Sequence, residues 1–147
     1  MIKKIHHYGN WTSKQELNPD NAFGFVYKIT NTNNGRMYIG KRQYHRWRKG
    51  KKLGPTKWQS YTGSSGELST DMKGAGKKAF TFEVLEQYNT RGWLVYGEAN
   101  YQHKLDVLTA YMDDGITRQF YNKQIGAIRY VPKQFDDPSP VPRKKKT

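Results

Sequence analysis

The stretch FGFVYKITNTNNGRMYIGK, residues 23–41, decides the fold. Aromatic and β-branched residues alternate with polar ones on both sides of Asn33, Asn34 and Gly35. A period of two is typical of strands, and an Asn-Gly pair between two such runs is typical of a hairpin. The stretch therefore predicts two antiparallel strands joined by a tight turn.

This hairpin places two tyrosines on one face. With a loop of two, four or six residues, Tyr27 and Tyr38 share a face of the antiparallel pair. A four-residue loop over 31–34 sets the two rings directly opposite each other, whereas a two-residue turn at Asn34-Gly35 separates them by four residues along the strands. We prefer the first register because it brings the two phenols together.

The remaining elements follow from periodicity and from cap residues. Ser64 and Glu67 stand at capping-box spacing, and the pair Asp113-Asp114 with Gly115 ends a long helical pattern. The expected elements are a basic helix at 41–52, a short helix at 65–73, a strand at 80–88, a long helix at 90–113 and a short strand within 120–132. This order predicts an α+β fold with a small antiparallel sheet.

The amino-acid composition excludes several classes of protein function. The chain has 147 residues, 26 Lys and Arg against 12 Asp and Glu, a formal charge of +14 and no cysteine. The lack of cysteine excludes a disulfide framework, a thiolate zinc site and a cysteine nucleophile. No apolar run suits a signal peptide or a membrane span, so we expect a cytoplasmic, intracellular protein with no membrane association. Nucleic acid is the expected partner of so basic a chain.

We divide the chain into an N-terminal lead-in at 1–22, one folded domain at 23–131 and a Pro-rich, basic C-terminal tail at 132–147. Within the domain, residues 36–57 hold nine Lys and Arg and no acid, interleaved with aromatic residues. Such cations neutralise phosphates, and such rings stack on bases. The candidates for DNA contact are Lys41, Arg42, Arg46, Lys49, Lys51, Lys52 and Trp58.

Glu98 is a carboxylate on an otherwise apolar helical stripe. The members of this stripe are Leu94, Glu98, Tyr101, Leu105, Leu108 and Met112. A carboxylate on a core-facing stripe costs several kcal/mol unless it is paired or holds a metal. Glu98 is therefore either half of a buried ion pair with an arginine or a ligand of Mg²⁺, which is often held by one or two carboxylates with water and substrate phosphate.

Together these residues resemble the GIY-YIG nuclease family. Phe25-Val26-Tyr27 is separated by ten residues from Tyr38-Ile39-Gly40-Lys41, and a basic segment, Glu98 and Asn122 follow. The second motif is intact, whereas Phe25 stands where the family usually has Gly. The segments YIGK, KWQSYTGSS and FYNKQI are similar to those of free-standing, phage-type homing endonucleases.

The resemblance implies a central three-stranded antiparallel sheet flanked by helices, and a DNA endonuclease that uses one divalent metal, Mg²⁺ or Mn²⁺. One active site cuts one strand at a time, which leaves open both nicking by a monomer and double-strand cutting by a dimer. The alternative from another class is a non-catalytic, basic nucleic-acid-binding module on the same scaffold.

The resemblance also implies roles for single residues. Tyr27 matches the general base, Tyr38 positions water or phosphate, Glu98 matches the metal ligand, and Asn122 helps to order the site. The family's catalytic arginine commonly lies eight residues after the glycine of the second motif, which points to Arg48. Arg42 and Arg46 are close competitors.

This chemistry needs an activated water, a cation on the developing charge and help for the leaving oxygen. A tyrosine with a pKa near 10 is a poor base at neutral pH. We expect Lys41, the arginines and the metal to lower the pKa of Tyr27, because nearby positive charge favours phenolate. A restriction-type site fits poorly, since residues 83–85 lack the lysine of its Glu-x-Lys pattern.

Overall fold

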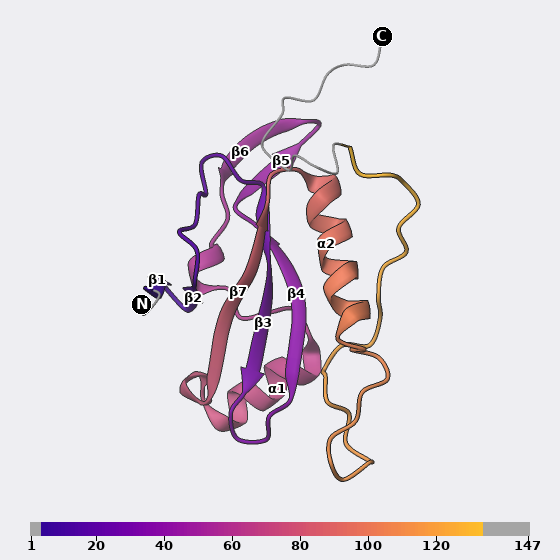
Figure 1. Cartoon of the computed structure of the whole chain (residues 1–147). Coiled ribbons are helices and arrows are strands. Elements are labelled where there is room, and N and C mark those ends of the chain that lie inside the picture. The colour runs from indigo at the N-terminus through magenta and orange to yellow at the C-terminus, as the bar shows by residue number, and fades with distance from the viewer. Residues whose placement is uncertain (1–3, 134–147) are drawn as a thin grey trace.

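Strand β3 (Gly24–Asn31) is an interior strand of the sheet, and both of its faces are apolar. Phe25, Tyr27 and Ile29 point to one face and Val26 to the other, and all four are at most 1% exposed. The computed structural model describes residues 4–133 and orders the main sheet as β1-β2-β7-β3-β4 (Figure 1).

The predicted α+β class and the antiparallel core of the sheet are confirmed. Strands β4 (Met37–Gln43) and β7 (Phe80–Tyr88) flank β3, both antiparallel to it. Strands β1 (His6–Tyr8) and β2 (Trp11–Ser13) extend the sheet beyond β7, and β2 runs parallel to β7. The other elements are β5 (His45–Arg48), β6 (Lys51–Pro55), η1 (Trp58–Ser60), α1 (Gly66–Ala75), η2 (Lys77–Ala79) and α2 (Arg91–Lys104).

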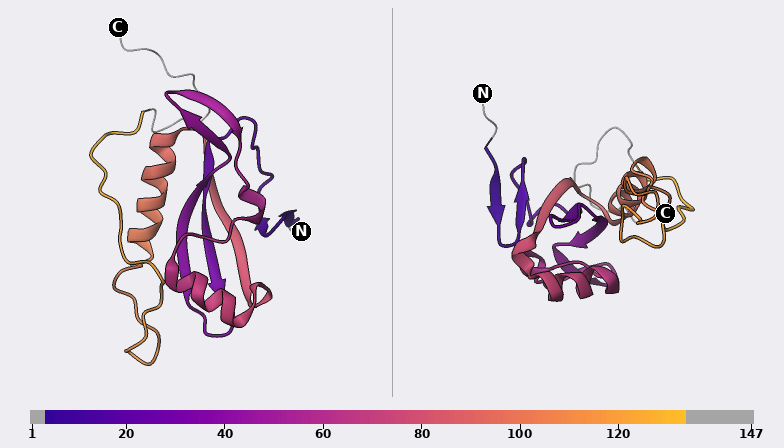
Figure 2. Two further views of the ribbon diagram at one scale, coloured as in Figure 1. Left: turned by 180° about the vertical axis from the view of Figure 1, so that it is seen from behind. Right: turned by 90° about the horizontal axis from the view of Figure 1, so that it is seen from below.

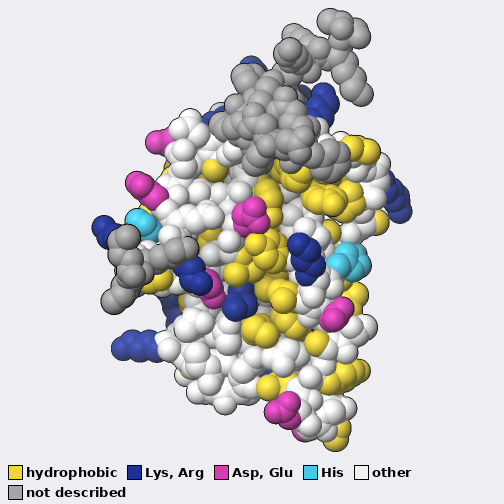
Figure 3. Space-filling view, in the orientation of Figure 1, with side chains coloured by type: hydrophobic (Ala, Val, Ile, Leu, Met, Phe, Trp, Pro, Cys, Tyr) yellow, Lys and Arg dark blue, Asp and Glu magenta, His cyan; other side chains and the backbone are white. Residues whose placement is uncertain are grey.

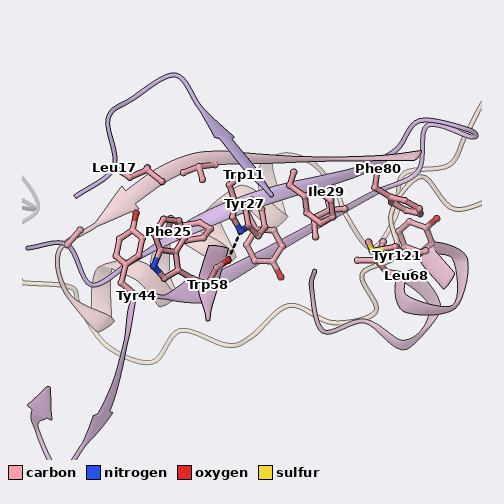
Figure 4. Close-up of a cluster of buried hydrophobic side chains, with 14 residues drawn as sticks. Trp11, Leu17, Phe25, Tyr27, Ile29, Tyr44, Trp58, Leu68, Phe80 and Tyr121 are labelled. Atoms are coloured by element: carbon pink, nitrogen blue, oxygen red, sulfur yellow. Dashed lines mark hydrogen bonds between the residues drawn. The ribbon is translucent and has the colours of Figure 1, made fainter. Parts of the chain in front are cut away.

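The two helices cover opposite faces of the sheet (Figure 2). On the α1 face, Leu68 and Met72 pack into an aromatic cluster that contains Tyr27 and Trp58 (Figure 4). On the α2 face, a smaller cluster is built from Phe23, Val26, Ile39, Tyr88, Leu94, Val107 and Phe120. None of the helices in residues 4–133 has the length and apolar character that a membrane span requires.

The strands β1 and β2 were not expected in the lead-in. Trp11 of β2 is fully buried, its ring lies 4.9 Å from that of Tyr27, and its Nε1 donates to the Trp58 carbonyl at 2.7 Å. Residues 6–13 therefore take part in the core. The division into lead-in, domain and tail stays a prediction, and residues 134–147 of the tail lie outside the described residues.

The preferred register of the β3–β4 hairpin was wrong by two residues. Tyr27 pairs with Gly40, and Ile29 pairs with Tyr38, so the two tyrosines are diagonal neighbours on one face. The cause is the turn: Gly35 takes a φ of 79°, and Asn31 Oδ1 accepts from the amide of Asn33 at 3.0 Å. The shared face of Tyr27 and Tyr38 was predicted correctly.

The expected basic helix at 41–52 was also wrong, because this segment ends β4 and forms the β5–β6 hairpin. Its turn is Lys49-Gly50, with φ values of 51° and 77°. Two left-handed residues in succession are what a tight hairpin turn requires. Tyr44 is fully buried at the base, where its carbonyl accepts from the Thr56 amide at 2.9 Å.

Both helices begin or end at a residue other than the one expected. The N-cap of α1 is Ser65 rather than Ser64, and its Oγ accepts from the Leu68 amide. Helix α2 ends at Lys104 rather than near Asp113, because Asp106 takes a φ of 53° and the Val107 amide bonds back to the Gln102 carbonyl at 3.1 Å. This is a Schellman end with Asp106 in place of glycine.

The expected apolar stripe continues beyond the end of α2, so only Leu94, Glu98 and Tyr101 of it lie on that helix. Leu105 and Leu108 are 40% and 39% exposed. In Figure 3, hydrophobic side chains are visible along the lower right of the molecule, where Figure 1 shows the segment after α2.

The last short strand expected within 120–132 is reduced to a bridge between Met37 and Phe120 at the outer edge of β4. Next to this bridge, the Asn122 side chain takes the place of a strand: its Oδ1 accepts from the Ile39 amide at 3.0 Å, and its Nδ2 donates to the Ile39 carbonyl at 2.8 Å. Gln102 of α2 donates to the same carbonyl at 3.0 Å. Within the described residues, pairing along this edge runs from Met37 to Ile39 and resumes at Gln43, whose carbonyl accepts from Thr56 Oγ1 at 2.7 Å. We call residues 40–42 of β4 the open edge.

Replacing Asn122 by Ala should cost about 1–3 kcal/mol of unfolding free energy, because the buried Ile39 amide loses its partner. Urea denaturation with Gln124→Ala, an exposed neighbour, as the control measures this loss. An equal midpoint for both variants would contradict the edge-pairing role of Asn122.

Candidate functional site

The glycine of the second motif leaves room for the tyrosine of the first. Gly40 is the direct partner of Tyr27 across the β3–β4 pair. A Cβ built on Gly40 would overlap the Tyr27 hydroxyl and lie 2.6 Å from Tyr27 Cζ and 2.9 Å from Tyr38 Cε2. The bare backbone at Gly40 therefore lets the Tyr27 ring extend across β4 toward the open edge.

Three tyrosines, which we call the tyrosine cluster, meet on this face: Tyr27, Tyr38 and Tyr61. The Tyr27 ring lies 6.2 Å from that of Tyr38 and 6.0 Å from that of Tyr61. The loop that carries Tyr61 turns at Gly63, whose φ is 92°, and Ser64 Oγ lies 3.3 Å from the Tyr38 hydroxyl. Buried Trp58 holds the start of this loop against the core (Figure 4).

Arg42 lies beside the tyrosine cluster. It is on the same face of β4 as Tyr38, and its guanidinium carbon sits 4.1 Å from the centre of the Tyr61 ring. Such stacking fixes a guanidinium plane while its edge stays free to donate. Arg42 Nε is a buried donor for which residues 4–133 supply no acceptor.

Glu98 reaches the same edge from the other face of the sheet. It lies on α2, and its Oε1 is 3.5 Å from Lys41 Nζ of β4. The Glu98 side chain is 20% exposed. Burial raises the pKa of Glu98, although Lys41 acts to lower it. Lys41 therefore compensates only part of the cost of burying the Glu98 carboxylate.

The expectation that the basic surroundings lower the pKa of Tyr27 is contradicted. Burial raises that pKa well above its usual value, and the neighbouring Tyr61, Tyr38 and Glu98 raise it further. Burial also raises the pKa of Tyr38, while the hydrogen bond to Ser64 acts in the opposite direction. Without additional positive charge, Tyr27 is a phenol at neutral pH, because desolvation penalises the phenolate.

The donor set fits a hard divalent cation rather than a zinc-type site. No group of three or more His, Cys, Asp or Glu side chains that could enclose a metal occurs in residues 4–133. Among the described residues, the carboxylate that reaches the open edge is that of Glu98. Mg²⁺ accepts such a sparse site because it keeps several waters and shares substrate phosphate oxygens.

The structure brings some of the candidate residues together and separates others. Tyr27, Tyr38, Lys41, Arg42 and Glu98 meet at the open edge, and Asn122 marks where it begins. Arg48, favoured on the expected helix, instead pairs with Lys51 beside the Lys49-Gly50 turn of the β5–β6 hairpin.

The expected DNA contacts are divided in the same way. Lys49, Lys51 and Arg46 are exposed on the hairpin, and Lys52 Nζ donates to the Asp20 carbonyl at 2.8 Å. Trp58 does not present its ring to a base: it is 3% exposed and packs against Phe25 and Tyr44.

Sequence reasoning missed Tyr61, Ser64 and Arg91. The first two belong to the KWQSYTGSS segment, where Gly63 followed by a helix cap signals a loop that folds back. Arg91 is the first residue of α2 and lines a cavity together with Arg42 and Arg46. No local pattern links Arg91 to residues more than forty positions earlier in the chain.

Two motif tyrosines on one face of an antiparallel hairpin, with a carboxylate brought in from a later helix, define the GIY-YIG class of α+β domain. A comparison with protein families agrees: the model described as "Putative endonuclease segE, GIY-YIG domain" matches residues 8–125. The chain therefore belongs to this family of GIY-YIG endonuclease domains. Neither the curated proteins nor the solved structures that were compared give a match.

Proposed function

We propose that this protein is a divalent-metal-dependent DNA endonuclease. The observation that carries the proposal is the convergence of Tyr27, Tyr38, Arg42 and the Lys41–Glu98 pair on the open edge. Simple phosphate binding needs cations and no buried tyrosine or carboxylate. The family match supports nuclease chemistry, and a net charge of +14 supports a polyanionic substrate.

Each residue at the open edge has a separate role in the proposed reaction. Glu98 and water would hold the metal, which when bound supplies positive charge to the scissile phosphate and favours deprotonation of nearby water and phenol groups. Tyr27, as the base, accepts a proton from the attacking water directly or through a second water. Tyr38, held by Ser64, positions that water or the phosphate.

The bond changes are those of hydrolysis. The water oxygen forms a bond to phosphorus, its proton passes to the phenolate form of Tyr27, and the bond from phosphorus to the 3′ oxygen breaks. The leaving oxygen takes up a proton from solvent, which gives a 5′-phosphate and a 3′-hydroxyl. Arg42 donates to the phosphate oxygens, whose negative charge grows as the transition state is approached.

The catalytic arginine we propose is Arg42 rather than Arg48. Its guanidinium is stacked on Tyr61 next to Tyr27, whereas Arg48 is exposed near the tip of the hairpin. Arg42→Ala should lower the single-turnover rate at saturating protein by about a hundredfold, in line with loss of one donor to developing charge. Arg48→Ala should keep the saturated rate, and the reverse pattern would contradict this assignment.

The function itself is tested with supercoiled plasmid incubated with Mg²⁺, Mn²⁺ or EDTA. Cleavage that requires the metal supports the endonuclease, and open-circle against linear product separates nicking by a monomer from double-strand cutting by a dimer. Tight DNA binding without cleavage in any metal would favour the non-catalytic module instead.

We further propose, on the segments YIGK, KWQSYTGSS and FYNKQI, that this is a free-standing, phage-type homing endonuclease encoded by a phage or mobile element. Cleavage confined to one long target in a phage genome would support this. Uniform degradation of any DNA would contradict it.

A further inference from the structure

A second cationic feature lies beside the open edge, at the base of the β5–β6 hairpin. It is a cavity of about 360 Å³, which we call the basic pocket. Its charged lining comes from three elements: Lys41 and Arg42 from β4, Arg46 from β5, which follows β4 in the sequence, and Arg91 from the distant α2. In Figure 1 the β5–β6 hairpin lies next to the end of α2 that carries Arg91.

The basic pocket holds positive charge that the described protein does not neutralise. None of its lining residues is an acid. The ion pairs in residues 4–133 are made by Lys28, Arg36 and Lys41, and neither Arg46 nor Arg91 is in one. A cleft lined by cations alone concentrates anions.

An aromatic ring also lies beneath the Arg91 guanidinium of the pocket. The Trp47 ring packs on Phe23 with ring centres 5.6 Å apart, and the Arg91 guanidinium carbon lies 6.0 Å from the centre of the Phe23 ring. His45, another lining residue, adds no charge at neutral pH, because burial and Lys52 lower its pKa. The positive charge there that is not paired with an acid is therefore carried by the guanidinium groups, and guanidinium is the cation that pairs with a phosphate through two parallel hydrogen bonds.

The distance between the pocket and the proposed catalytic carboxylate suits a DNA strand. Arg91 and Glu98 lie on the same helix, seven residues apart, which corresponds to about 10 Å along its axis. Each nucleotide of a duplex strand advances about 3.4 Å along the DNA axis, and successive phosphates are further apart than this projection, so at most about three nucleotides span the distance.

We propose that the basic pocket binds one backbone phosphate of the strand being cut, within about three nucleotides of the scissile phosphate, with Arg46 and Arg91 as its ligands. This inference rests on the proposed nuclease function. Lys41 and Arg42 line both the pocket and the open edge, so the two sites form one continuous track for the strand. Occupancy of the pocket then fixes which bond faces Tyr27, and Arg91 is a residue that sets the position of the cut.

The test measures binding in EDTA, so that it does not depend on cleavage. Arg91→Ala should weaken the affinity for a short duplex about tenfold, as expected for loss of charged hydrogen bonds, and lower the slope of log affinity against log salt by about one. Arg91→Lys should keep the slope and lose part of the affinity. Lys73→Ala, which removes an exposed cation of α1, is the matched control.

A set of duplexes with one neutral methylphosphonate at successive positions then locates the phosphate. One position should weaken binding by the wild type and have no effect on Arg91→Ala. Equal behaviour of Arg91→Ala and Lys73→Ala, or the same methylphosphonate profile for wild type and Arg91→Ala, would overturn the inference. Free inorganic phosphate that abolishes the Arg91 effect at millimolar concentration would show a pocket for the free ion instead, and would overturn it as well.

Failure of the inference and failure of the proposed function give different results. Metal-dependent cleavage with an unchanged cut position in Arg91→Ala would overturn the phosphate subsite and leave the nuclease in place. Arg91-dependent binding with no cleavage in Mg²⁺ or Mn²⁺ would support the subsite and overturn the nuclease.

Discussion

Glu98→Gln should reduce metal-dependent DNA cleavage by at least about a thousandfold while the domain stays folded. Glu98 is the carboxylate at the open edge, and an amide keeps its shape but lacks the charge that holds a divalent cation. Burial raises the pKa of Glu98, so its charged form is disfavoured in the metal-free protein. Removal of this charge should leave thermal stability unchanged or slightly higher, as is common for residues kept for function.

Three measurements check this prediction: single-turnover cleavage, Mn²⁺ binding followed by water proton relaxation, and thermal unfolding. Glu83→Gln on β7 is the matched control, because Glu83 also pairs with a lysine, at 3.6 Å from Lys28 Nζ. Glu83→Gln should cut DNA and bind Mn²⁺ like the wild type. Cleavage by Glu98→Gln at the parent's rate would remove Glu98 from the proposed metal site.

Tyr27→Phe should reduce the cleavage rate by about two to four orders of magnitude with little change in DNA affinity, because only the proposed proton acceptor is lost. The ring keeps its packing against Trp11 and Tyr61. Because burial raises the pKa of Tyr27, the phenolate fraction below that pKa grows tenfold for each pH unit. The wild-type rate should therefore rise with pH between about 6 and 9, and the rate of Tyr27→Phe should not.

Tyr88→Phe is the control for loss of a buried hydroxyl outside the tyrosine cluster, since Tyr88 donates to Glu86 at 3.0 Å on the α2 face. Its rate and pH profile should match those of the wild type. If Tyr27→Phe keeps the wild-type pH dependence while Tyr38→Phe loses it, Tyr38 is the base and the two roles are exchanged.

The sequence predicts the β3–β4 hairpin, strand β7 and the helix that carries Glu98. In each of these elements the periodic pattern of apolar residues extends over several residues. Tyr27 and Tyr38 share a face in every even-length loop, so their proximity survived an error of two residues in the register. The register itself depended on the Asn31 side chain and on the left-handed Gly35, which periodicity does not report.

Other features could not be predicted because the deciding contact is distant in sequence or unusual in type. Arg and Lys favour helices by propensity, yet residues 45–55 form a hairpin because Tyr44 is buried and Lys49-Gly50 turns the chain. The end of α2 was missed because Asp106, and not a glycine, takes the left-handed conformation. The choice of Arg42 over Arg48 requires the Tyr61 ring, nineteen residues further along.

The open edge has a further consequence for the behaviour of the protein in solution. An unpaired strand edge is a template on which another chain can add a strand, and charged side chains along such an edge oppose that addition. Lys41 and Arg42 therefore oppose strand addition between copies of the domain at this edge, besides the role that we propose for them at DNA. A neutral residue at either position weakens this protection, so a fall in the activity of Arg42→Ala can have two physical causes. Light scattering separates them. A variant that stays monomeric has lost a catalytic group, whereas an aggregated variant has lost solubility.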